Sequence, residues 1–261
     1  MLYSNHDRPL VPDRRCCRPA GPGNRRPCRG LGRRGVGAVT PITFHHVTLK
    51  HGERVVLSDL SGTLAPGSLT AVIGSNGSGK TTLLRAIAGL HPVATGTIDR
   101  GGLRPAETAL LAQGSHLDRS FPVCCLEVVA LAGPRLGLLR PVGRDHLAAA
   151  RAALKKVGLA GFEQRQIRAL SAGQFQRVLF ARTIVQDASL ILLDEPFTAV
   201  DADTVEVLLS VIADWHAQGR TVVTVLHDLE LARRHFPQIL RLADQRATWT
   251  PDSAAGLHRA A

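Results

Sequence analysis

The stretch Gly74–Thr81, GSNGSGKT, constrains the fold of this chain more than any other feature. It follows the apolar run Leu69–Ile73 and precedes the apolar-periodic run Leu83–Ala88, so a strand, a glycine-rich turn and a helix succeed one another. Glycines let consecutive backbone N–H groups point inward, and the helix N-terminus adds a positive dipole. The pattern predicts a P-loop, in which Lys80 reaches the β- and γ-phosphates and the Thr81 hydroxyl is a ligand of Mg²⁺. The residues expected to contact the nucleotide here are Gly74, Ser75, Asn76, Gly77, Ser78, Gly79, Lys80, Thr81 and Thr82.

Apolar runs alternate with helical patterns through most of the remaining chain. Leu190–Leu193 and Thr221–Leu226 are nearly all apolar, which is typical of parallel strands covered on both faces. Before the P-loop, residues 42–64 alternate as antiparallel strands do, whereas residues 114–170 turn helical. The sequence therefore predicts an α/β fold: a P-loop NTPase parallel sheet with an antiparallel β-layer and an inserted helical subdomain.

Capping residues set the expected ends of three helices. Asp145 is the expected N-cap of an alanine-rich helix that Gly158 ends, and Asp201 is the expected N-cap of a helix that Gly219 ends. A further helix is expected to open at Ser171.

The segment 1–37 differs in composition from the rest. It is rich in Arg, Pro and Gly, and its first 36 residues hold nine arginines against two aspartates, so they carry +7 of the net charge of +11. This composition predicts disorder, with an over-extended gene start or an arginine-rich presequence as alternatives. The +4 left for the remaining residues indicates no specific nucleic-acid partner. We expect an ATPase domain at 38–250, its helical subdomain at about 114–170, and a flexible C-terminus at 251–261.

Cysteine content and hydropathy exclude two further classes of protein. Five cysteines in 261 residues make no disulfide framework, and Cys124 and Cys125 are expected to be small apolar residues in a reducing cytoplasm. The three tail cysteines lack a histidine pair at finger-like spacing, which argues against a metal site. No apolar run approaches the roughly 20 residues that span a bilayer, so any membrane role is expected to be peripheral.

Polar residues follow several of the apolar runs. Asp194 and Glu195 follow one buried strand, His227 follows the next, and Gln113 follows a shorter one. Ligands of open α/β sheets bind at the carboxyl ends of strands, so we expect these side chains to converge on the P-loop. Asp194 fits a carboxylate that holds Mg²⁺, and Gln113 fits a ligand to Mg²⁺ and water. Glu195 fits the base or the positioner of the attacking water, and His227 fits a contact of the γ-phosphate that also holds the geometry of the water. A solvated strand end and a structural histidine are the alternatives.

The stretch Leu170–Arg177, LSAGQFQR, lies between the P-loop and the strand that ends in Asp194. Its Ser171 lies 91 positions beyond Lys80 and shortly before the strand that ends in Asp194. With these motifs the chain, over about residues 42–245, resembles the ATP-binding subunits of ABC transporters. The stretch Leu170–Arg177 looks like the signature motif of this family. The resemblance implies an ATPase that binds ATP and Mg²⁺ and forms a homodimer, in which the signature motif of one subunit binds the γ-phosphate of ATP held by the other. It implies that these further residues contact the nucleotide across the dimer: Ser171, Ala172, Gly173, Gln174 and Asp201.

Two positions depart from the family pattern. Ala172 stands where the family's signature has its first glycine, which adds one methyl group near the phosphate. His51 stands where an aromatic residue stacks on adenine in the family, and an imidazole stacks more weakly. We expect ATPase activity to survive with Ala172 in the motif, and we expect His51 to be the residue that contacts adenine.

Softer similarities point to a branch of the family. The form of the signature motif, the segment Ser120–Val123, and the stretches His227–Glu230 and His235–Gln238 are similar to zinc and manganese importers, most of all zinc. This resemblance implies a peripheral subunit at the cytoplasmic face of the plasma membrane. It would serve an integral membrane permease, docked around Phe121 and Leu126, and indirectly an extracytoplasmic metal-binding protein. Manganese or iron-chelate import and a non-transport ABC ATPase are the alternatives; the chain has one P-loop and no long coiled coil, which disfavours the last.

Overall fold

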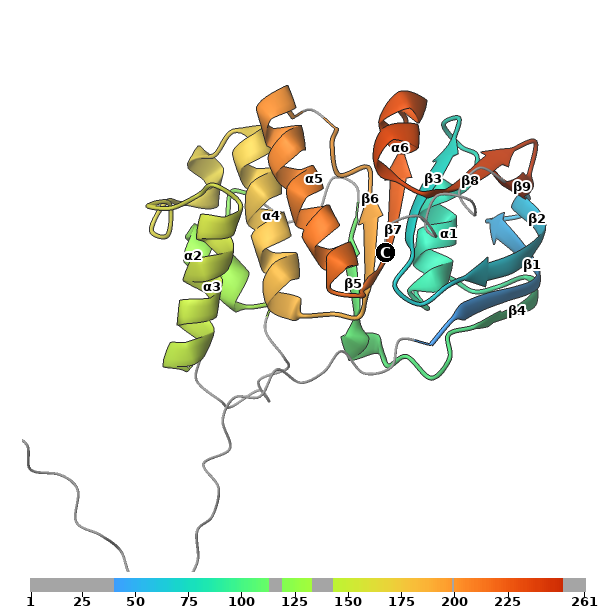
Figure 1. The fold of residues 1–261 in the computed structure, drawn as a ribbon, viewed down its shortest axis with the longest axis horizontal. Helices are drawn as coiled ribbons and strands as arrows, with labels where there is room; N and C mark the ends of the chain where they lie inside the picture. The colour runs from blue at the N-terminus through green and yellow to red at the C-terminus, as the bar shows by residue number, and fades with distance from the viewer. Residues whose placement is uncertain (1–39, 113–118, 133–142, 199, 251–261) are drawn as a thin grey trace, which may run out of the picture. The chain divides into compact units, whose positions relative to one another are not determined.

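A six-stranded sheet carries the P-loop. A computed structural model describes residues 40–112, 119–132, 143–198 and 200–250, and its strand order in this sheet is β5-β6-β7-β3-β8-β9 (Figure 1). Neighbours from β5 to β8 pair in parallel, and β9 pairs antiparallel with β8 at the edge. The strands are β3 (Leu69–Gly74), β5 (Thr108–Leu111), β6 (Leu190–Asp194), β7 (Thr221–Leu226), β8 (Gln238–Ala243) and β9 (Arg246–Trp249).

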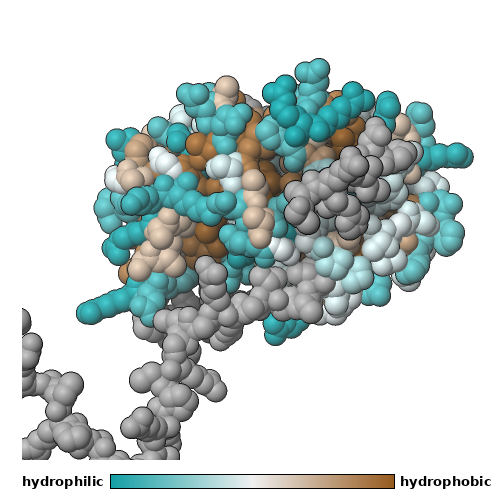
Figure 2. Space-filling model, viewed as in Figure 1, coloured by the Kyte–Doolittle hydropathy of each residue, from teal (hydrophilic) through white to brown (hydrophobic). Residues whose placement is uncertain are grey.

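Both faces of this sheet are buried, as the apolar strands predict. Along β6, Ile191 and Leu193 join a hydrophobic cluster with the helices of one face, whereas Leu190 and Leu192 join a second cluster on the other face. Over α4 and α5, hydrophobic side chains show between hydrophilic ones on the surface (Figure 2). The longer helices are α1 (Lys80–Ile87), α3 (Arg144–Lys156), α4 (Ala172–Gln186) and α5 (Ala202–Ala217).

The predicted antiparallel layer is present and covers α1. Its order is β2-β1-β4, and both pairs are antiparallel. Trp249 of β9 reaches this layer, since its Nε1 donates a hydrogen bond to the Ser61 carbonyl over 3.3 Å. A Cβ at Gly62 would lie 2.4 Å from that nitrogen, so the ring can sit there only beside a glycine. The strands of the layer are β1 (Ile42–His51), β2 (Arg54–Leu64) and β4 (Thr95–Asp99).

The helical segment between the P-loop and α4 differs from its prediction in two places. The N-cap of α3 is Gly143, so Asp145 lies in the first turn, where its carboxylate faces the positive end of the helix. Leu126 is 6% exposed and packs in the core, so it cannot belong to a docking surface, whereas Phe121 is 64% exposed. Gly158 does follow the end of α3, with a φ of +72°. The short elements of the region are η1 (Pro105–Glu107), α2 (Cys125–Ala130) and η2 (Ile167–Ala169).

The chain beyond His227 holds structure that the sequence reading did not specify. It forms α6 (Leu229–His235), then β8 and β9, which complete the large sheet. Within the described ranges, no helix combines the length and the hydrophobicity that crossing a bilayer requires.

Candidate functional site

The polar residues that follow three apolar strands lie at one edge of the large sheet. β6, β7 and β3 are consecutive parallel neighbours, so their carboxyl ends lie side by side. Asp194 ends β6 and Glu195 follows it, His227 follows β7, and the P-loop follows β3. The structure thus brings two carboxylates, an imidazole and the P-loop lysine to one place. Gln113 lies outside the described residues.

The P-loop wraps around its own lysine. Lys80 is 5% exposed, and its Nζ donates to the carbonyls of Gly74 over 2.9 Å and Ser75 over 3.0 Å. Gly79, the N-cap of α1, has a φ of +93°, and a Cβ there would lie 3.2 Å from Val56. Only a glycine therefore fits this turn without strain. Burial lowers the pKa of Lys80, and the nearby carboxylates of Glu195 and Asp194 act in the opposite direction.

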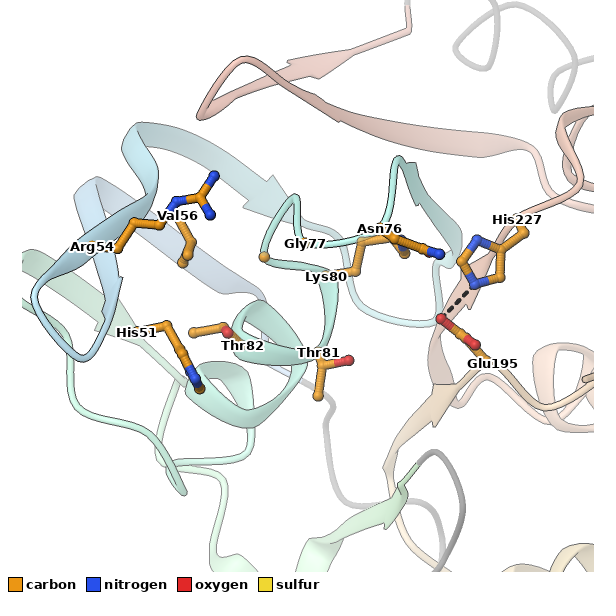
Figure 3. A pocket seen from close by; sticks show the side chains of 11 residues that line it. His51, Arg54, Val56, Asn76, Gly77, Lys80, Thr81, Thr82, Glu195 and His227 are labelled. Atoms are coloured by element: carbon orange, nitrogen blue, oxygen red, sulfur yellow. Dashed lines mark ion pairs between the residues drawn. The ribbon is translucent and has the colours of Figure 1, made fainter.

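A cavity of about 450 Å³ opens over the P-loop (Figure 3). The β1–β2 hairpin supplies one wall and the ends of β6 and β7 the other, with the start of α1 between them. A cavity of this size lies in the range of small-molecule sites. Its lining residues are His51, Arg54, Val56, Asn76, Gly77, Gly79, Lys80, Thr81, Thr82, Glu195 and His227.

Three P-loop residues expected to contact the nucleotide do not line this cavity. Gly74 and Ser75 instead present their carbonyls to Lys80. The Ser78 hydroxyl is buried and has no hydrogen-bond partner within the described part of the chain. A Cβ at Gly74 would lie 2.6 Å from that hydroxyl, which explains the glycine at this position.

Glu195 and His227 form an ion pair at the wall opposite the hairpin. Glu195 Oε1 lies 2.5 Å from His227 Nε2, and the Thr198 hydroxyl donates to Glu195 Oε2 over 3.4 Å. The side chain of Glu195 is 9% exposed and that of His227 is 44% exposed, so the carboxylate is sheltered and the imidazole meets the cavity. Glu195 has a φ of +50°, a left-handed conformation that costs energy in a residue with a Cβ. Figure 3 shows Asn76 and Lys80 pointing toward this pair.

Two oxygen-bearing side chains suit Mg²⁺. Thr81 lines the cavity with its hydroxyl, and Asp194 holds a carboxylate, 3% exposed, at the end of β6. Hard oxygen ligands of this kind, beside phosphate, are what Mg²⁺ prefers. The residues present therefore fit the ion predicted from the sequence.

The residues of the signature motif occupy a different place. Ser171 is the N-cap of α4, and its Oγ accepts from the Gln174 N–H over 3.2 Å while Gln174 Oε1 accepts from the Ser171 N–H over 3.1 Å. This reciprocal capping box rigidifies the turn. Ser171 and Ala172 are exposed. None of the signature residues lines the cavity of their own chain.

The N-terminus of α5 packs against the signature turn, the segment Leu170–Phe175. Asp201 caps α5, since its Oδ1 accepts from the Thr204 N–H over 2.8 Å and its Oδ2 from the Thr204 hydroxyl over 3.0 Å. These hydrogen bonds, the backbone one first, hold the pKa of Asp201 below its usual value. A Cβ at Gly173 would lie 3.2 Å from both the Asp201 carboxylate and the Thr204 hydroxyl. Gly173 is therefore the small residue that lets α4 and α5 meet.

Arg54 is a residue of the cavity that the sequence reading missed. It pairs directly with His51 across the β1–β2 hairpin, and both side chains are exposed at the mouth. Only the hairpin register could have predicted Arg54 from the sequence, because the turn at Gly52 and Glu53 sets which residues of the two strands face each other. The structure gives this end of the cavity two basic side chains.

Comparison with known proteins decides the family. A sequence family described as ABC transporter matches residues 57–198, more than half of the chain. This chain belongs to the ABC transporter family, as an ATP-binding subunit. It is accordingly an ATPase, and the resemblance seen in its motifs is confirmed.

Curated relatives of this ABC subunit extend over most of its length. The manganese transport system ATP-binding protein MntB of Bacillus subtilis is 37% identical over 216 residues, which cover 81% of this chain and 86% of that protein. The zinc transport system ATP-binding protein TroB of Treponema pallidum is 39% identical over 208 residues, which cover 77% of each chain.

Solved structures of ABC cassettes share the fold of this subunit. The cassette MJ0796, in a dimeric post-hydrolysis state with ADP and phosphate, matches with a TM-score of 0.68 and 27% identity over 79% of this chain and 96% of that one. A chain of an inward-facing ABC transporter described as of metal-chelate type matches with a TM-score of 0.72 and 26% identity, over 80% of this chain and 82% of that one. The predicted fold class is confirmed.

Proposed function

We propose that this subunit hydrolyses ATP to power the import of a divalent transition metal through a membrane permease. Zinc is the cargo proposed first, on the sequence stretches that resemble zinc importers, and manganese is the alternative. The relatives support a metal importer, because they are named for manganese transport at 37% identity and for zinc transport at 39% identity. These two identities are too close to choose between the metals.

The proposed chemistry is in-line attack of water on the γ-phosphate. The P-loop N–H groups and Lys80 bind the β- and γ-phosphates, and Glu195 orients the attacking water and accepts its proton. His227 contacts the γ-phosphate and keeps the Glu195 carboxylate in place. Thr81, Asp194 and Gln113 would hold Mg²⁺, which would supply positive charge against the negative charge of the phosphates.

The proposed assembly is a head-to-tail homodimer that encloses two ATP molecules. Ser171 and the N-terminus of α4 in one subunit bind the γ-phosphate over the P-loop of the other, since helix N-termini favour anions. Asp201 and Gln174 are proposed to contact the same interface. The exposed ring of Phe121 is proposed to touch the permease at the cytoplasmic face of the membrane, with an extracytoplasmic metal-binding protein on the far side.

One observation carries the proposed hydrolysis: the sheltered Glu195 carboxylate, 2.5 Å from His227 in the cavity that holds Lys80. Glu195→Gln keeps the size of the side chain and removes the base, so turnover is expected to fall about 10²- to 10³-fold while ATP binding persists. The measurement is steady-state phosphate release together with size-exclusion chromatography in ATP. Unchanged turnover would overturn the role of Glu195.

The cargo needs a separate experiment. A strain that lacks this subunit is expected to lose uptake of radioactive zinc and to regain it with the wild-type gene but not with Lys80→Met. Loss of manganese uptake alone would select the alternative, and loss of neither would refute both zinc and manganese as the cargo.

A further inference from the structure

We infer that Arg119 is a positioning residue for the signature turn, the segment Leu170–Phe175. This inference rests on the proposed function, because it concerns how the signature turn contacts ATP in the dimer. Arg119 lies 51 residues before Leu170 in the sequence, yet its side chain contacts both flanks of the turn.

One guanidinium makes both contacts. A terminal nitrogen of Arg119 donates a hydrogen bond to the carbonyl of Leu170, the residue directly before the N-cap Ser171. The Cζ of the same side chain lies 4.8 Å from the centroid of the Phe175 ring, in a cation–π contact. Phe175 itself is tied to the cap, since its N–H donates to the Ser171 carbonyl over 2.9 Å. Arg119 therefore contacts the chain on both sides of Ser171, at Leu170 before it and at Phe175 after it.

The geometry of the turn makes this contact necessary. Leu170 is 5% exposed, and a buried carbonyl requires a donor. The Gln174 N–H, which would be its helical donor if α4 began one residue earlier, is used by the Ser171 hydroxyl over 3.2 Å. Arg119 supplies the donor instead, and its planar fork can do so while it stacks on Phe175.

The outer side of the same turn is open. Ser171 and Ala172 are exposed, whereas Leu170 and Phe175 are buried against Arg119. A turn held on its inner side loses less conformational freedom when it binds a phosphate on its outer side, and preorganisation of this kind strengthens association. Removing the guanidinium should weaken ATP-dependent dimerisation and leave ATP binding to the separate P-loop unchanged.

Arg165 provides a matched control. It lies in the same helical region and its Cζ is 4.0 Å from the centroid of the Phe162 ring, so it makes the same kind of cation–π contact without touching the signature turn. Arg119→Met and Arg165→Met both remove a guanidinium and keep an unbranched apolar side chain. Each is introduced into the Glu195→Gln chain, which is expected to hold the ATP-bound dimer.

The test measures two quantities for each variant. The first is the protein concentration at half-dimerisation in saturating Mg²⁺ and ATP, by analytical ultracentrifugation; the second is the affinity of the dilute monomer for a fluorescent ATP analogue. Arg119→Met is expected to raise the concentration at half-dimerisation about tenfold, which corresponds to the loss of one hydrogen bond from a charged donor. It is expected to leave the affinity of the monomer for the ATP analogue unchanged. Arg165→Met is expected to change neither.

Each result has a definite meaning. If the Arg119 and Arg165 variants dimerise alike, the positioning role is wrong. If Glu195→Gln alone forms no dimer in ATP, the proposed sandwich is wrong and the inference falls with it. Should Arg119→Met melt far below the control, Arg119→Lys decides the question, because it keeps the charge without the planar fork and is expected to weaken dimerisation severalfold.

Discussion

The P-loop region and the signature turn are both built at the N-terminus of a helix, but their functional groups are used differently. Around the P-loop, side chains from β2, α1 and the ends of β6 and β7 point into one cavity. At the signature turn, Ser171 and Gln174 hydrogen-bond to each other, and neither residue lines the cavity over the P-loop. We propose that the first region binds a ligand within the chain, whereas the second presents a prearranged surface to another molecule.

The largest effect is expected at the P-loop. Lys80→Met removes the buried ammonium that the loop wraps around, so ATPase activity should fall by about 10³-fold or more and ATP affinity with it. Steady-state phosphate release and equilibrium binding of ATP check this. A variant that still binds ATP as wild type would break the contrast between the two regions.

The next effect is expected at His227. His227→Ala removes the partner 2.5 Å from Glu195 and the proposed contact with the γ-phosphate, so kcat should fall about 10- to 10²-fold with little change in KM. Asp228→Ala is a neighbouring control, because that side chain caps α6 through the N–H groups of Glu230 and Leu231. Equal losses in the two variants would assign His227 a structural role only.

Gly173 tests the second region. Gly173→Ala places a methyl group 3.2 Å from the Asp201 carboxylate and the Thr204 hydroxyl, so α4 and α5 must shift slightly apart. ATPase activity should fall about tenfold through weaker dimerisation, whereas ATP binding to the dilute monomer stays as in wild type. A loss of ATP binding by the monomer equal to that of Lys80→Met would show that the signature turn does not act only in the dimer.

The smallest effect is a pH dependence at Asp201. Its pKa in the folded state is lowered, so its contribution to stability is complete above the unfolded pKa of about 3.9 and is lost as the pH falls through the lower folded value. Asp201→Asn keeps a capping oxygen and cannot titrate. In thermal melts the advantage of wild type over this variant should shrink from pH 6 to pH 3. A constant difference would show that the cap is independent of charge.

Local signals account for what the sequence predicted well. A stretch of about ten residues is enough to predict each of these features: the P-loop, the caps Ser171 and Asp201, and the apolar strands with polar ends. The common edge of the three strand ends then followed from the parallel sheet alone. Cys125 is buried, as expected of a small apolar residue, and this burial raises its pKa to about 11.

Long-range packing accounts for what the sequence did not predict. Arg54 enters the cavity through a hairpin register, and Arg119 reaches the signature turn across 51 residues. The prediction that Leu126 lies on a docking surface is wrong, because the apolar residues of α2 do not indicate which face of the helix meets α4. The N-cap of α3 is Gly143, two residues before the predicted Asp145.

We propose that the site of one chain is completed by the signature turn of another. Lys80→Met inactivates the P-loop half and Ser171→Arg inactivates the signature half, so each variant alone should lack ATPase activity. In a mixed dimer, however, one site combines both intact halves. Mixing the two inactive proteins is therefore predicted to restore ATPase activity well above the sum of the separate proteins. A mixture as inactive as its components, under conditions where sedimentation shows that they dimerise, would contradict the account.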